Sequence, residues 1–179
     1  MSKAKSTFET SIKDAEELLA HFDGLPKPPP QSADVLKRAG LVMALTAWET
    51  YVEDLAMEDV TARLRVVDGS YVGKFVLKRL DDELKRFHNP TSDKVKRLFV
   101  DFLEVDVTAH WEWSNYDCAK AKKTLDELIS KRGDAVHRSK PAAAGASPVP
   151  HLVKREDLDK AIRFLKALVE ATDLALARA

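Results

Sequence analysis

Apolar residues recur every three or four positions along most of this chain, and that spacing is typical of amphipathic helices. Runs in which apolar and polar residues alternate between turn residues, which would indicate strands, are nearly absent. The pattern therefore predicts an all-α fold, an up-and-down bundle of about five to six helices. At 179 residues we expect one domain that spans residues 1–179.

Turn and capping residues divide the chain into six predicted helices. Gly24 ends the first, while Ser32, Ser92 and Asp117 are suited to cap the second, fourth and fifth. The expected ranges of the first five are 7–22, 32–64, 71–87, 92–102 and 118–137. Small residues and prolines predict a flexible loop over about 138–153, and a last amphipathic helix follows it.

The second predicted helix is apolar on nearly every side over residues 39–47, so we expect it at the centre of the bundle. Its uncharged run is about half of the roughly 20 residues that cross a bilayer, so no membrane span is predicted. Trp48 and Tyr51 on this helix are expected in the core. Trp111 and Trp113 lie in an irregular segment, where they would either stack on bases or anchor a loop.

Charge and cysteine usage exclude several classes of function. The chain has 29 basic and 29 acidic side chains, so any site for a polyanion must be a local patch. Cys118 is the single cysteine, which rules out an intramolecular disulfide and fits a small apolar residue in a first helical turn. No apolar signal segment precedes residue 20, and we expect a cytoplasmic protein. No metal or other cofactor is expected, because potential ligands lack a recognised spacing (His110, Glu112, Asp117 and Cys118).

The fifth predicted helix carries a charge where its pattern calls for burial. The apolar stripe continues by one turn onto Arg132, where a guanidinium needs a carboxylate, a ligand phosphate or a second subunit as partner. His137 follows five residues later, about 140° around an ideal helix. Gly133 between them tolerates a kink, and our hypothesis is that such a kink turns His137 toward Arg132.

Two segments resemble a known family. The fifth predicted helix ends in Arg-x4-6-His, here RGDAVH at residues 132–137, and an earlier helix contains the aromatic and acidic segment AWETYVEDL at residues 47–55. These features resemble the HEPN superfamily (higher eukaryotes and prokaryotes nucleotide-binding), in particular its RiboL-PSP-HEPN type, over about residues 7–175. The resemblance implies a metal-independent endoribonuclease of defence or toxin type. It also implies a homodimer whose two motifs meet in one cleft, RNA as substrate, and a cognate antitoxin or other protein partner.

Two positions differ from the family pattern. The residue after the arginine is commonly Asn, Asp or His and is Gly133 here, with Asp134 one place later; a glycine often follows the histidine, where this chain has Arg138. The glycine favours an alternative function, a non-catalytic module that binds RNA, a nucleotide or a protein partner.

The chemistry of the two motif residues suits RNA cleavage by the 2′-hydroxyl. His137 would act as general acid and base, because an imidazole has an unperturbed pKa of about 6.5. Arg132 would stabilise the charge of the phosphorane. We expect Glu49 to orient His137 or neutralise Arg132, unless it is simply exposed, and Asp134 to support the pair.

Basic residues around the motif predict contacts with RNA phosphates. Seven basic and three acidic side chains lie between residues 120 and 140. Lys131, Arg138 and Lys140 are the expected RNA contacts, because cations near a cleft supply sequence-independent phosphate affinity. The alternative is that these side chains form an ordinary solvated helix face.

Overall fold

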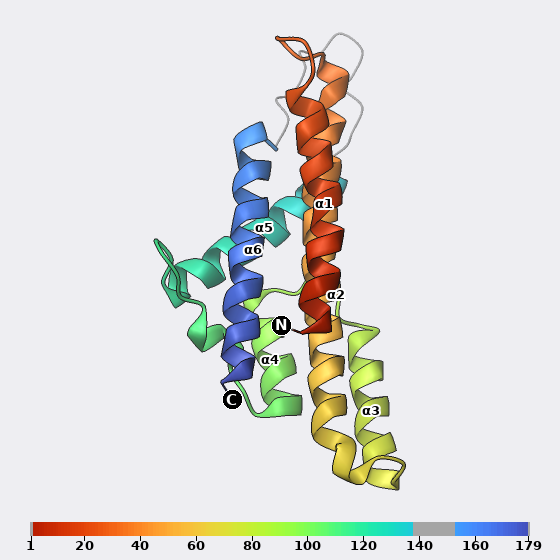
Figure 1. The fold of residues 1–179 in the computed structure, drawn as a ribbon. Coiled ribbons are helices and arrows are strands. Elements are labelled where there is room, and N and C mark those ends of the chain that lie inside the picture. Colours follow the sequence, from red (N-terminus) through yellow and green to blue (C-terminus); the bar gives the residue numbers. More distant parts are fainter. Residues whose placement is uncertain (1, 138–152, 179) are drawn as a thin grey trace.

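The computed structural model describes residues 2–137 and 153–178, and within them the fold is all-α (Figure 1). The predicted helical bundle is therefore confirmed. In these two described ranges six helices follow one another, with short 3-10 segments at Gln31–Ala33, Leu64–Val67 and Val107–His110. The helices are α1 (Lys3–Asp23), α2 (Asp34–Arg63), α3 (Tyr71–Leu84), α4 (Ser92–Leu103), α5 (Cys118–His137) and α6 (Arg155–Ala177).

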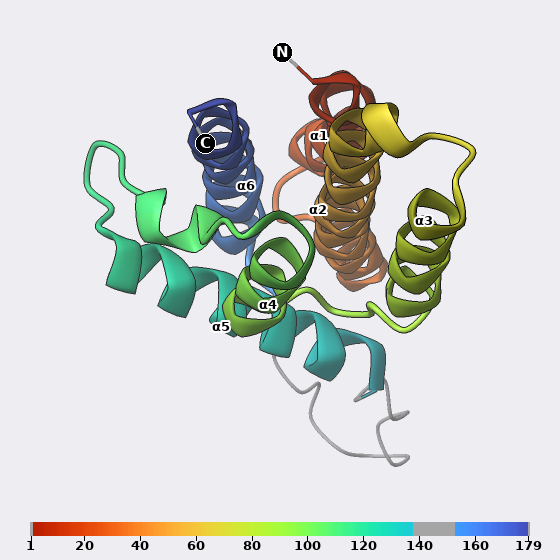
Figure 2. The same cartoon turned by 90° about the horizontal axis from the view of Figure 1, so that it is seen from below.

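The long helix α2 is the centre of the arrangement, as its apolar middle predicts. It contacts each of the other five helices. Helix α1 runs antiparallel beside it, α6 lies alongside, and α3 covers its C-terminal half (Figure 1). Helix α5 crosses behind α6 and α2, and the view from below shows it on one side of the bundle next to α4 (Figure 2).

The core of the bundle comes from the stripes that the spacing predicts. Trp48 and Tyr51 of α2 are fully buried, as expected, and the Tyr51 hydroxyl donates to the Val169 carbonyl of α6 at 3.2 Å. Gly40 lets α2 approach α6 closely, because a Cβ there would lie 2.7 Å from a methyl carbon of Leu158. Any larger residue at position 40 would force the Leu158 side chain to shift.

The helix ends match the predictions in part. Gly24 follows α1 and donates to the Ala20 carbonyl, and Asp117 caps α5 through the Lys120 N–H at 2.7 Å, both as expected. The Ser32 cap is wrong, because a 3-10 turn comes first and α2 begins at Asp34. The Ser92 cap is also wrong, because Thr91 accepts from the Lys94 N–H and Ser92 is the first residue of α4.

The irregular segment before α5 is an anchor on α6. Trp111 is fully buried and its indole N–H donates to the Thr172 hydroxyl at 2.9 Å. Trp113 stacks on Tyr116, with ring centroids 4.9 Å apart, and both rings contact Phe164. Of the two roles left open for these tryptophans, the structure supports loop anchoring, which fixes where α5 begins.

The loop expected over 138–153 lies outside the described residues except at its end. Val153 is described and fully buried, and it precedes α6, which begins at Arg155. Within the described ranges, no helix is both long and apolar enough to cross a membrane.

Candidate functional site

The predicted charge on α5 lies where that helix passes α2 and the loop between α3 and α4. Arg132 is half-buried, and its Nη1 donates to Oε2 of Glu49 on α2 at 2.8 Å. The side chains are 21% and 17% exposed, so solvent screens this ion pair less than it would a surface pair. Glu49 is therefore a partner of Arg132 and is not simply exposed.

Two further side chains surround the guanidinium. Arg132 Nη1 lies 3.3 Å from Oδ1 of Asn89 in the loop, and Nη2 lies 3.5 Å from the Thr46 hydroxyl, one turn before Glu49. The Asn89 backbone N–H points to Glu49 Oε2 at 3.4 Å. Asn89 has φ 54, a left-handed conformation that asparagine tolerates better than most residues. Arg132, Glu49 and Asn89 thus form one hydrogen-bonded cluster, which we call the Arg132 site.

The neighbouring residues Trp48 and Glu49 hold the same loop from two sides. The Trp48 indole N–H donates to the Pro90 carbonyl at 3.3 Å from inside the core. Glu49, one position later on α2, reaches Asn89 at the edge of the core. The aromatic and acidic pair Trp48 and Glu49, in residues 47–55, therefore has a structural role: it fixes the α3–α4 loop against Arg132.

Helix α5 is tied to its neighbours by two more polar contacts. Asp126 accepts from the backbone N–H and the hydroxyl of Ser92, both at 2.8 Å, at the first turn of α4. Lys131 donates to Asp157 in the first turn of α6 at 2.9 Å. Sequence reasoning missed Asp126, because no local spacing links it to a serine 34 residues earlier. Together with the Arg132 ion pair, these contacts set the position of α5.

Lys131, an expected RNA contact, forms an ion pair with Asp157. Burial raises the pKa of Asp157, but the hydrogen bonds from Lys131 and the Lys154 backbone outweigh it, so this pKa lies below its ordinary value. The Lys131 side chain remains 38% exposed. The other two expected contacts, Arg138 and Lys140, lie outside the described residues.

Helix α5 continues as one α-helix through Gly133 to His137. A Cβ on Gly133 would meet nothing within 4 Å. An unbroken helix turns about 140° over the five residues from Arg132 to position 137, so the two positions belong to different faces of α5. The side chains of Asp134 and His137 lie outside the described residues, and their expected roles remain predictions.

A histidine that sequence reasoning missed lies at the Arg132 site. His88 precedes Asn89 in the loop, its Nδ1 is 3.7 Å from Glu49 Oε1, and its side chain is 72% exposed. Glu49 thus faces Arg132 with one oxygen and His88 with the other. The only sequence signal was its place beside the Asn89-Pro90 turn, which marks a loop and says nothing of what the loop contacts.

Glu53, one turn after Glu49 on α2, adds a second acid to this part of the surface. Burial raises its pKa, the charges of Glu49 and Asp54 raise it further, and His88 opposes them. The carboxylates on this face of α2 therefore interact unfavourably with one another and favourably with the cations around them.

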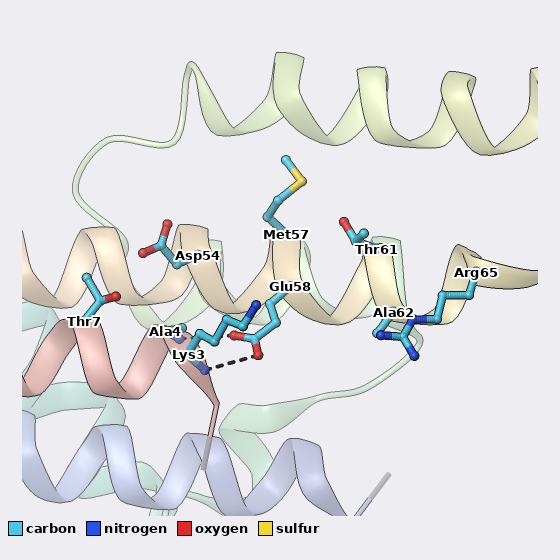
Figure 3. Close-up of a pocket in the computed structure, with 9 residues that line it drawn as sticks. All are labelled: Lys3, Ala4, Thr7, Asp54, Met57, Glu58, Thr61, Ala62 and Arg65. Carbon is cyan, nitrogen blue, oxygen red and sulfur yellow. Dashed lines mark hydrogen bonds between the residues drawn. The ribbon is translucent and has the colours of Figure 1, made fainter. Parts of the chain in front are cut away.

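Two other features have structural explanations. A groove of about 500 Å³ between α1 and α2 is lined by both acids and bases (Figure 3), but its Glu58 accepts the Lys3 and Ala4 backbone N–H groups at 3.2 and 3.1 Å and so caps α1. Burial and the Glu112 carboxylate raise the pKa of the Cys118 thiol, which favours its protonated form. In the described part of the chain, no three His, Cys, Asp or Glu side chains gather as they would around a metal ion.

Comparison with known proteins identifies a family. The family model of RiboL-PSP-HEPN matches residues 9–178, a range that contains the whole Arg132 site and the Arg-x4-6-His segment. No curated protein and no solved structure matches the chain.

Proposed function

The chain belongs to the RiboL-PSP-HEPN family, and from this premise we propose that it is a metal-independent endoribonuclease of defence or toxin type that acts as a homodimer. The observation that carries the proposal is the half-buried guanidinium of Arg132, which α2 and the α3–α4 loop hold in place. An arginine in such a position is suited to a bound phosphate.

Arg132 is the proposed phosphate ligand. A guanidinium has five N–H donors in a planar fork, more than its contacts with Glu49, Asn89 and Thr46 require. Because these contacts orient the group before substrate arrives, little reorganisation is needed when negative charge develops on the phosphorane. We further propose that Lys131, Arg138 and Lys140 contact flanking phosphates of the RNA.

His137 is the proposed carrier of protons. It takes the proton of a ribose 2′-hydroxyl, whose oxygen then forms a bond to the adjacent phosphorus. The bond from phosphorus to the 5′-oxygen breaks, and that oxygen leaves with a proton donated by the imidazolium. The products are a 2′,3′-cyclic phosphate and a free 5′-hydroxyl, so the reaction consumes no water. In the proposed mechanism the imidazole moves the protons and the guanidinium balances the phosphorane charge, so no metal takes part.

A dimer resolves a difficulty of geometry. In an unbroken α5, positions 132 and 137 lie on different faces, so one chain does not readily offer both groups to one phosphate. Two paired α5 helices would supply Arg132 from one subunit and His137 from its partner.

The proposal is tested by incubating single-stranded RNA with the purified protein in EDTA. We expect cleavage that leaves 2′,3′-cyclic phosphate ends and is lost in Arg132→Ala and in His137→Ala. Lys123→Ala is the control, because Lys123 is on the same helix with a side chain 77% exposed. Intact RNA with the wild-type protein, or full cleavage by both variants, would overturn the proposal.

The shared site has its own test. Arg132→Ala and His137→Ala proteins are mixed and allowed to exchange subunits. A site built across two subunits regains cleavage in the mixture, because one cleft of each mixed dimer has both groups. A site built within one chain stays inactive.

A second candidate function is a module that binds RNA, a nucleotide or a protein partner without cleaving it. Two observations favour it: the family departure at Gly133, and the carboxylate of Glu49 that already neutralises Arg132. In the same assay it predicts intact RNA together with binding that Arg132→Ala weakens.

A further inference from the structure

We propose that His88 is a second catalytic imidazole of the Arg132 site and takes the proton of the attacking 2′-hydroxyl, with Glu49 holding its other nitrogen. This inference rests on the proposed function and revises one step of it: His88 in place of His137 takes the 2′-hydroxyl proton, and His137 keeps the acid role, protonation of the leaving 5′-oxygen. No local motif contains His88; the fold alone brings it to the site.

The first support is the shared carboxylate. Glu49 lies 2.8 Å from Arg132 Nη1 through Oε2 and 3.7 Å from His88 Nδ1 through Oε1. The imidazole and the guanidinium are therefore on the two sides of one carboxyl group. A catalytic hydrogen bond is often this long before substrate binds and shortens in the complex.

The second support is the way in which the loop is fixed. The His88 carbonyl accepts from the Lys94 side chain of α4, the Pro90 carbonyl accepts from Trp48, and the Thr91 N–H donates to the Asn89 carbonyl at 2.9 Å. The backbone around His88 is thus anchored to two helices. The imidazole itself is 72% exposed, so substrate can reach it.

The chemistry follows from the position of Nδ1. A carboxylate that accepts a hydrogen bond from the Nδ1–H fixes the tautomer in which Nε2 has a free lone pair, and Nε2 can then take a proton from a hydroxyl group. Two acids of α2, Glu49 and Glu53, interact with this imidazole. The nearby cations contact its surroundings: Lys94 of α4 donates to the His88 carbonyl, and Arg132 of α5 donates to Glu49. A phosphate on Arg132 would place the neighbouring ribose near His88.

The first experiment compares the pH profiles of single-turnover cleavage by wild-type protein, His88→Gln and His110→Gln. His110 is an exposed histidine in the segment Val107–His110 and serves as the control. We expect His88→Gln to lower the rate by roughly 10²-fold or more, the usual contribution of a general base. In the wild type the rate should rise with pH on the acid side of the profile, because a general base must be deprotonated. We expect His88→Gln to lose this rise, and His110→Gln to keep both the wild-type rate and the wild-type profile.

The outcomes separate the two proposals. If His137→Ala abolishes cleavage while His88→Gln keeps the wild-type rate and profile, the assignment of His88 is wrong and the proposed function stands. If wild-type protein leaves RNA intact, both are wrong.

A second experiment reads contact with substrate directly. The histidine ring signals are followed by NMR while a 2′-O-methyl oligonucleotide, which lacks the attacking hydroxyl, is added. The signal that disappears in His88→Gln is expected to shift, and the His110 signal is expected to stay. An unmoved His88 signal at saturating oligonucleotide would overturn the proposal.

Discussion

The carboxylate of Glu49 lies 2.8 Å from the guanidinium of Arg132, and 83 residues separate the two in the chain. The pair has two opposite effects on a phosphate. It orients the guanidinium, which favours a reaction there, and it places a negative charge beside the position of the phosphate, which opposes binding.

We therefore expect Glu49→Gln to separate binding from cleavage. Affinity for a 2′-O-methyl oligonucleotide should rise severalfold, because the opposing charge is gone. Single-turnover cleavage should fall by at least 10-fold, because a neutral amide holds Arg132 and His88 less firmly. Fluorescence anisotropy and a quenched cleavage assay measure the two quantities.

The control for this variant is Glu127→Gln, which removes the same charge from the exposed face of α5, where the side chain is 66% exposed. It should change affinity slightly and cleavage not at all. Weaker binding by Glu49→Gln, with cleavage of the bound RNA unchanged, would contradict the role given to Glu49.

A second prediction concerns stability. Asp126→Ala removes both hydrogen bonds to Ser92 at the first turn of α4 and should lower the free energy of unfolding by roughly 1.5–3 kcal/mol, the usual value for a bond to a charged group. Urea denaturation measures it. Glu127→Ala, at the next position of the same helix, should have a free energy of unfolding within about 0.5 kcal/mol of the wild type. If both variants lost the same stability, the hydrogen bonds of Asp126 to Ser92 would have no specific stabilising effect.

Much of the fold could be predicted because the information is local. Stripes of apolar residues predicted six helices, the central position of α2 and the burial of Trp48, and the stripe on α5 led to Arg132. The caps show the limit of such reasoning. Ser32 and Ser92 have suitable side chains, but a 3-10 turn precedes α2, and Thr91 occupies the cap before α4.

The contacts of the site could not be predicted because they join distant segments. The sequence suggested Glu49 as a partner and left exposure as the alternative, and only packing decides between the two. No sequence signal linked Asp126 or His88 to its partner: Asp126 contacts a serine on another helix, and His88 lies on a turn whose position depends on Trp48.

A third prediction follows from the burial of Glu53. Burial and the charges of Glu49 and Asp54 raise the pKa of this carboxyl, so its ionisation destabilises the folded protein as the pH rises above the ordinary pKa, and this loss is complete above the raised pKa. Below the ordinary pKa of about 4.3 both folded and unfolded chains are protonated, and the effect vanishes. Glu53→Gln should therefore be more stable than the wild type at pH 7 and gain little at pH 3.5.

Urea denaturation at the two pH values measures this difference. Glu127→Gln, an exposed acid on α5, is the control and should show little change at either pH. A Glu53→Gln protein that is less stable than the wild type at pH 7 would mean that the carboxylate has a stabilising partner and that burial is not the dominant effect.

The last prediction asks whether the site needs a bend in α5. Gly133→Ala places a methyl group where nothing lies within 4 Å, in a helix that continues to His137, so the variant should be more stable by up to about 1 kcal/mol. Ser130→Ala, an exposed position one turn earlier, gives the smaller gain expected from helix propensity alone.

If Arg132 and His137 act from two subunits, as we propose, Gly133→Ala keeps its cleavage rate, because a straight helix presents both groups to the partner. If a kink must bring His137 to the arginine of its own chain, the added stability comes with a loss of cleavage. Thermal unfolding and the single-turnover assay on one sample therefore distinguish a bent α5 from a paired one.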